Sequence, residues 1–206
     1  MLSYDDVKSV ILKKGYRFFI NVDSINIIGV RSNESTNKFS DYICVLWMDS
    51  NYNKHIQTFP CTTKPGKHWL LNPLNINGTI ILMEGQYLGV YKLGIHNRSR
   101  PSRSYEALEQ VKPMKYFRDN NKDQVLDYSG KIYEGNFKTN IHRSAKSGWS
   151  KFVDKWSAGC QVITGFFRNT ETTNWERFLT LCKMSERKYG NLFSYTLINE
   201  KDFRKL

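Results

Sequence analysis

One segment of the sequence, residues 139–163, concentrates residue types that can carry out covalent chemistry. It contains His142 and Cys160. The small residues that directly precede the cysteine are Ser157, Ala158 and Gly159. A cysteine nucleophile needs a base for the thiol proton, backbone N–H groups that hold an oxyanion, and exposure to substrate. Small residues before a cysteine allow a tight turn whose amides point at the reacting carbonyl, so the segment predicts Cys160 as nucleophile and His142 as base.

Four neighbouring residues are candidate supports for this pair. Because side chains alternate along a strand, Asn140 shares a face with His142 and could orient the imidazole or support the site. Arg143 beside the base could hold a substrate carboxylate bidentately, or be a solvated edge charge. His96 could contact substrate or assist the site, although a surface or structural histidine explains it as well. Gln161 follows the nucleophile and is a candidate substrate contact.

Other residues favour structural interpretations. Tyr87 alternates with apolar residues, which favours packing over a substrate contact. Cys44, Cys61 and Cys182 lie in apolar contexts typical of buried small hydrophobes. The histidines lack neighbouring cysteines, so we expect neither a metal site nor a cofactor.

The pattern around Cys160 resembles the catalytic signature of the L,D-transpeptidase (YkuD-type) family. That signature is a histidine, a spacer, Ser or Thr, a second histidine, Gly and Cys. His142, Ser157, Gly159 and Cys160 match it, with residues 143–156 as spacer. Ala158 replaces the second histidine, and Gln161 with Val162 reverses the family's hydrophobic-then-polar order. More loosely, residues 59–66 and 85–91 are similar to the family's upstream strands.

The resemblance implies a β-rich cysteine enzyme that acts on peptidoglycan stem peptides through a Cys160 thioester. The backbone amides of Ala158, Gly159 and Cys160 would form the oxyanion hole. Water as acceptor would give hydrolysis and an amine would give transpeptidation. We expect hydrolysis, because the N-terminal residues do not resemble a secretion signal and the chain is basic. These features suit a phage or injection-system lytic protein, made in the cytoplasm, carried with other virion proteins and acting at the cell wall.

Composition limits the alternatives. The chain has 206 residues and 40% of them are hydrophobic, which excludes intrinsic disorder and predicts one domain over residues 1–206. No apolar run is long enough to insert into a membrane. The net charge of +12 favours a polyanionic partner such as an anionic wall or nucleic acid. No nucleic-acid-binding motif is present, so specific nucleic-acid binding is disfavoured. A catalytically inactive wall-binding or virion structural module with the same fold remains an alternative.

The secondary structure expected around these residues is mainly β. Stretches rich in β-branched and aromatic residues predict strands at 16–31, 42–48, 54–63, 78–83, 86–93, 132–141, 161–167 and 193–198. Apolar spacing predicts helices at 3–15 and from Thr173 or Asn174 onward, and helical turns are expected in 105–111 and 150–158. These elements predict a mainly β (α+β) fold, an antiparallel sheet or sandwich with a few peripheral helices.

One further segment resembles a metal-binding motif. Residues 119–127 place acidic or amide side chains at 119, 121, 123 and 127, as at the start of a calcium loop. Gln124 occupies the expected glycine position. An Asx-rich turn explains the composition equally well, so the sequence leaves calcium open.

Overall fold

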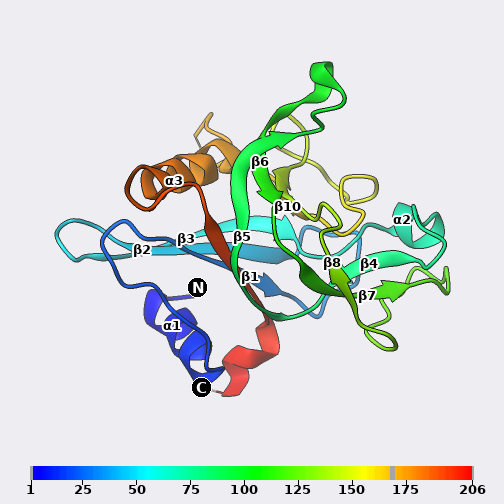
Figure 1. Ribbon diagram of the computed structural model, residues 1–206, viewed down its shortest axis with the longest axis horizontal. Coiled ribbons are helices and arrows are strands. Elements are labelled where there is room, and N and C mark those ends of the chain that lie inside the picture. The colour runs from blue at the N-terminus through cyan, green and yellow to red at the C-terminus, as the bar shows by residue number, and fades with distance from the viewer. Residues whose placement is uncertain (1, 168–169, 206) are drawn as a thin grey trace.

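The computed structural model describes residues 2–167 and 170–205, and its largest feature is a closed β-barrel (Figure 1). In the order in which they pair, the barrel strands are β1 (Asn26–Arg31), β11 (Phe193–Asn199), β5 (Gly85–His96), β6 (Tyr105–Gln110), β9 (Ile141–Arg143), β10 (Gln161–Ile163), β3 (Lys54–Thr62) and β2 (Asp41–Met48). A second, three-stranded sheet consists of β4 (Thr79–Leu82), β7 (Met114–Asp119) and β8 (Tyr133–Gly135). The helices are α1 (Tyr4–Lys13), α2 (Lys67–Leu71) and α3 (Asn174–Tyr189), with short 3-10 turns η1 (Pro101–Arg103) and η2 (Glu200–Lys205).

The expected mainly β class is confirmed, but in place of the expected antiparallel sheet or sandwich the strands form a closed barrel of mixed pairing. Most strand pairs are antiparallel, whereas β1 pairs with β11 and β9 with β10 in parallel. The barrel closes because the C-terminal strand β11 lies between β1 and β5, so neither strand is left as an open edge. These pairings are remote in sequence, and local strand patterns carry no information about them.

Helix α1 explains why β1 shows no alternation of buried and exposed residues. Ser3 caps the helix by accepting from the Asp6 N–H, and Asp6 bonds back to the Ser3 N–H. The buried face of α1 packs on Ile28 of β1, while Ile27 on the other side of the strand belongs to the barrel core. Every residue of β1 is therefore buried.

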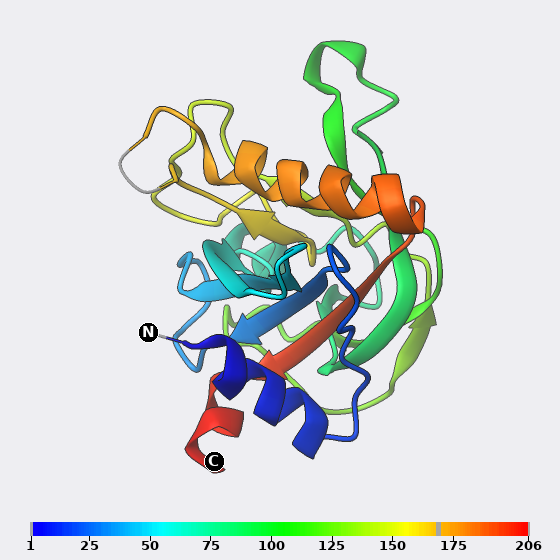
Figure 2. The same cartoon turned by 90° about the vertical axis from the view of Figure 1, so that its left-hand side faces the viewer.

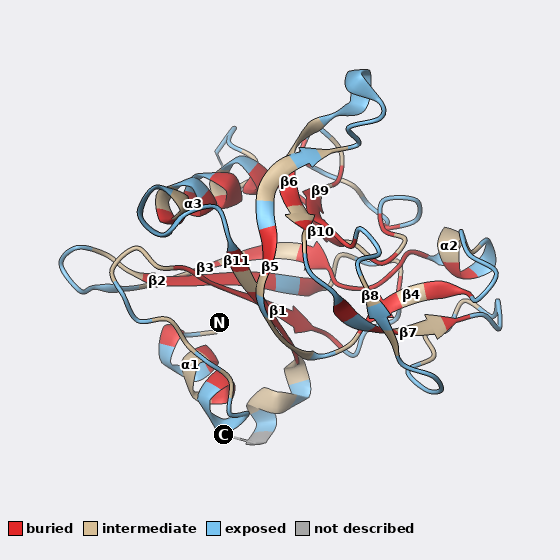
Figure 3. Cartoon of the chain, in the orientation of Figure 1, coloured by how far each residue is buried: buried red, intermediate tan, exposed pale blue. Residues whose placement is uncertain are grey.

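Helix α3 covers the barrel on another side, as Figure 2 shows. Of the two expected starting residues, Thr173 is the cap, and it exchanges hydrogen bonds with Glu176. Phe178 on its apolar face packs edge-to-face on Phe59 of β3, with ring centroids 5.7 Å apart. Figure 3 shows buried residues along the barrel strands and on the inner face of α3, with exposed residues at the loop tips.

Several local expectations are wrong. Residues 105–110 form strand β6 rather than a helical turn, because they pair with β5. Of the stretch 16–31, only the part beginning at Asn26 is a strand. The strands at 78–83 and 86–93, expected from the sequence as a pair around Glu84 and Gly85, do not pair with each other, since β4 joins the second sheet and β5 joins the barrel. Residues 150–158 contain turns and no helix.

Candidate active site

The parallel pair β9–β10 brings together the two ends of the segment 139–163, which contains His142 and Cys160. Val162 lies opposite His142, and the Gln161 N–H donates to the Asn140 carbonyl at 3.0 Å. Cys160, directly before β10, therefore faces Asn140, and His142 is the diagonal neighbour. The fold thus places Cys160 beside Asn140, at the start of the strand that pairs with the strand of His142.

The turn before Cys160 is held by side chains rather than left open. Ser157 Oγ donates to the Cys160 carbonyl at 2.8 Å and accepts the Gly159 N–H at 3.2 Å. Gln161, fully buried, donates to the Gly159 carbonyl at 3.2 Å. Ser157 and Gln161 therefore shape the turn, and Gln161 is not exposed to a substrate.

Gly159 is required by both conformation and space. Its φ is +128°, and an added Cβ would lie 2.5 Å from Ile80 Cγ1 in β4. Because the Gly159 N–H already bonds to Ser157, the expected three-amide oxyanion hole is reduced to two donors. The backbone N–H groups of Ala158 and Cys160 donate to no group among the described residues.

Cys160 is the one cysteine of the four that is partly exposed, while Cys44, Cys61 and Cys182 are buried as expected. Its thiol donates to the Lys138 carbonyl with an S···O distance of 3.6 Å. Desolvation raises the pKa of the Cys160 thiol to about 11, and the nearby Asn140 N–H opposes that rise. The resting group is therefore a neutral thiol.

His142 is 3% exposed, and one contact fixes its tautomer. Its Nδ1 lies 2.8 Å from the Arg143 carbonyl oxygen, which can only accept, so Nδ1 carries the proton. Nε2 is then left with a lone pair. Tyr105 Oη donates to the same carbonyl oxygen at 3.2 Å and also lies 3.2 Å from His142 Nδ1, so it helps to hold the imidazole in position. Burial, with a smaller contribution from His96, lowers the pKa of His142 to about 3, so the ring is neutral at pH 7.

His96 is a closer part of the site than its sequence context indicates. Its ring stacks on His142, with centroids 4.3 Å apart and planes 19° apart. The side-chain amide nitrogen of Asn140 lies 3.2 Å from His96 Nδ1. The side-chain oxygen Oδ1 of Asn140 accepts the Gln110 N–H. Asn140 therefore orients His96 directly and His142 only through the stack. Burial lowers the pKa of His96 as well.

The other candidate substrate contacts have structural partners. The Arg143 guanidinium lies 4.1 Å from the centre of the Tyr105 ring and donates to the Ser144 carbonyl. The Tyr87 hydroxyl donates to the Met83 carbonyl at 2.8 Å, and its ring packs against the core. Tyr87 does not line the cavity at Cys160. Sequence spacing gave no signal for Tyr105, because only the β5–β6–β9 pairing brings it to His142.

A cavity of about 400 Å³ opens beside Cys160. Its wall includes Ile80 from the second sheet and Leu74 from the segment before β4. Arg118 of β7 also lines it, and donates through Nη1 to the Gly78 carbonyl at 2.8 Å. The Arg118 Nε is buried and has no partner among the described residues. The sequence did not single out Arg118 either, since its position depends on the second sheet.

The segment 119–127 folds as a series of Asx turns. Asn121 accepts the Asp123 N–H, and Asp123 accepts the Val125 N–H at 2.7 Å. Within the described residues no group of three or more His, Cys, Asp or Glu side chains is arranged to hold a metal ion. The geometry therefore favours the turn interpretation over a calcium loop.

Across residues 2–167 and 170–205, no helix combines the length and apolar character needed to cross a membrane. Comparison with known protein families, with curated protein sequences and with solved structures finds no match to this chain. The candidate site therefore rests on its own residues and geometry.

Proposed function

We propose that this chain is a cysteine enzyme that cleaves or exchanges amide bonds in peptidoglycan stem peptides. The observation that carries the proposal is the fixed tautomer of His142. Its Nδ1–H is committed to the Arg143 carbonyl, so Nε2 is a proton acceptor on the strand beside Cys160. A nucleophile, a base in the right tautomer and a third group that orients the base are the parts that covalent acyl transfer requires.

In the proposed reaction the Cys160 thiol gives its proton to His142 Nε2 as the sulfur attacks the substrate carbonyl carbon. The N–H groups of Ala158 and Cys160 stabilise the tetrahedral oxyanion. The intermediate collapses as His142 returns the proton to the leaving amine, which leaves a thioester on Cys160. Water or an acceptor amine then attacks the thioester, and the thiol is restored. Because both resting groups are neutral, proton transfer accompanies attack rather than preceding it.

The surroundings of Cys160 support a peptide substrate that carries a carboxylate. The cavity combines the apolar wall at Ile80 and Leu74 with the partly buried guanidinium of Arg118. We infer that Arg118, rather than Arg143, contacts a stem-peptide carboxylate, because Arg118 lines the cavity at Cys160 and Arg143 does not. The net charge of +12 would favour adsorption to an anionic wall. Delivery with a phage or injection particle is part of the same proposal.

A second candidate is a catalytically inactive wall-binding or virion structural module. One observation favours it: the Cys160 thiol donates to the Lys138 carbonyl, and the pKa of that thiol is raised rather than lowered. Activated cysteine nucleophiles generally show the opposite shift.

Mass spectrometry of muropeptides and intact sacculi, incubated with wild-type protein or Cys160→Ala, separates the two candidates. We expect new fragments or exchanged termini with the wild type alone, and their masses distinguish hydrolysis from transpeptidation. Cys160→Ser serves as the matched variant of nearly unchanged size. Unchanged muropeptides across several wall types, with equal sacculus binding by all three proteins, would refute the enzyme and support the binding module.

A further inference from the structure

A second cavity, larger than the one at Cys160, lies where the two sheets meet the C-terminal segment. Its volume is about 610 Å³. Its lining comes from Arg31 and the loop 32–36 after it, the turn at 83–84, Phe117 of β7, residues 124–128 between β7 and β8, and residues 199–201. The two cavities share no lining residue. A ligand of this larger cavity is therefore independent of the proposed function.

Arg31 is the buried cation of this cavity, and its side chain is 2% exposed. It donates through Nε to Thr63 Oγ1 at 3.1 Å and through Nη2 to the Thr63 carbonyl at 2.8 Å. Both acceptors are neutral. A guanidinium has five N–H donors and does not lose its charge in proteins, so three donors and a full positive charge remain. Within the described residues no carboxylate lies at ion-pair distance from Arg31.

The buried carboxylate on the neighbouring strand is already compensated. Asp41 Oδ1 lies 3.0 Å from Lys64 Nζ, and both side chains are almost fully buried. Asp41 Oδ2 also accepts the N–H and the hydroxyl of Thr63. Thr63 Oγ1 links Asp41 to Arg31 as well, so Arg31, Lys64 and Asp41 form a buried cluster with one net positive charge. A buried charge without a counter-charge is costly, which favours an external anion at this position.

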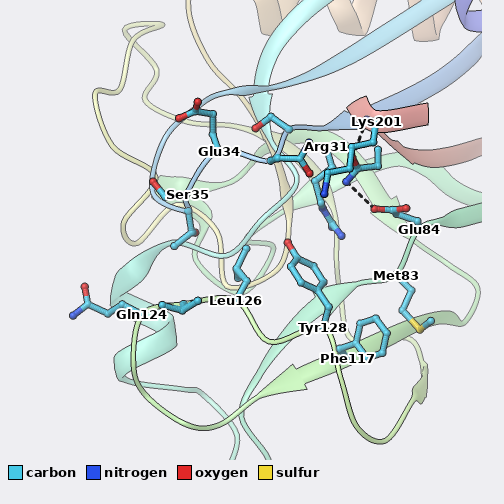
Figure 4. A pocket seen from close by; sticks show the side chains of 15 residues that line it. Arg31, Glu34, Ser35, Met83, Glu84, Phe117, Gln124, Leu126, Tyr128 and Lys201 are labelled. Atoms are coloured by element: carbon cyan, nitrogen blue, oxygen red, sulfur yellow. Dashed lines mark hydrogen bonds between the residues drawn. The ribbon is translucent and has the colours of Figure 1, made fainter. Parts of the chain in front are cut away.

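The residues around Arg31 indicate what the uncharged part of a ligand would contact. Figure 4 shows the Arg31 side chain beside Tyr128, whose ring centre is 5.6 Å from the guanidinium carbon. Met83, Phe117 and Leu126 supply apolar surface. Three more charged residues line the cavity: Glu34, Glu84 and Lys201. Glu34 pairs with Lys38 at 3.2 Å, and Glu84 and Lys201 carry opposite charges. The buried Arg31 therefore decides which charge the cavity prefers.

We propose that this cavity binds a small monocarboxylate with an aromatic or branched aliphatic body. The carboxylate pairs with the free edge of Arg31, and the body lies between Tyr128 and the apolar wall. A guanidinium edge matches the geometry of two carboxylate oxygens. Clefts of this size with one charged group in an apolar lining are typical small-molecule sites.

The test compares two probes that differ only in charge. Binding of N-acetyl-phenylalanine and of N-acetyl-phenylalaninamide to the full chain is measured by calorimetry and by NMR line broadening. A charge-assisted hydrogen bond predicts that the acid binds about tenfold to hundredfold more tightly than the amide. Equal affinity of the two probes, or no binding of the acid at about 5 mM, would overturn the proposal.

Variants then locate the site. Arg31→Gln is expected to remove the preference for the acid, and Tyr128→Ala to weaken both probes about equally. Tyr52→Ala, an exposed tyrosine outside the cavity, is the matched control and should bind as the wild type does. If Arg31→Gln does not fold, the binding of the two probes to Tyr128→Ala decides whether this cavity is the site. Unchanged binding in that variant would place the probe elsewhere and refute the assignment.

Discussion

The pH dependence of Cys160 alkylation tests the state of the candidate nucleophile. Burial raises the pKa of the thiol from 9.0 to about 11, so at pH 8 its thiolate fraction is about a hundredfold below that of a free cysteine. The rate of alkylation by iodoacetamide should therefore rise about tenfold per pH unit from pH 7 to pH 10, without a plateau. We also expect it to stay below the rate of a small free thiol throughout that range.

Intact-protein and peptide mass spectrometry would follow the reaction and locate the label. Labelling should occur at Cys160 alone in the native protein, because Cys44, Cys61 and Cys182 are 0% exposed. His142→Gln should leave the pH dependence of the alkylation rate unchanged, since a neutral imidazole does not stabilise a thiolate. A plateau below pH 8 that disappears in His142→Gln would refute this reasoning, because it would show a thiolate–imidazolium pair in the resting site.

Three further predictions concern stability, each measured by denaturant unfolding. Burial holds the pKa of His142 at about 3 against 6.5 when unfolded, so its stability contribution is complete above pH 6.5 and is lost as pH falls toward 3. The stability of His142→Gln should fall less steeply over that range, by up to about 1.4 kcal/mol per pH unit, and equal slopes would contradict the burial argument. Gly159→Ala should destabilise by more than about 1 kcal/mol beyond Gly130→Ala, since both positions have positive φ and only Gly159 lacks space for a Cβ. Asp41→Asn should cost about 3–5 kcal/mol because it leaves Lys64 buried without its counter-charge, and a loss under about 1 kcal/mol would exclude that pairing as a major term.

The predictions from local pattern were accurate for α3, β2 and β3. Helix spacing and capping chemistry predict α3 and its apolar face and leave Thr173 or Asn174 as its cap, and the structure shows that Thr173 is the cap. Strands β2 and β3 follow from runs of β-branched and aromatic residues. These signals are contained within one element, so the sequence carries them directly.

For the candidate site too, the sequence predicted some features and not others. Spacing in residues 139–163 singled out His142, Cys160 and the small residues of the turn. It could not show that Ser157 takes the Gly159 N–H, which removes one of the expected oxyanion donors. It also could not show that Asn140 bonds to His96 rather than to His142. Both depend on distances that the folded backbone sets.

Contacts between segments remote in sequence could be identified only in the folded structure. Tyr105 meets His142 through the β5–β6–β9 pairing, and Arg118 reaches the Cys160 cavity through the second sheet. Arg31 lies in a strand whose two faces are both covered, so an alternating pattern could not mark it as buried. Residue types and their local spacing indicate which side chains can do chemistry and which helices and strands form. Barrel closure sets which of those side chains meet, because strand pairing between distant segments depends on the whole chain.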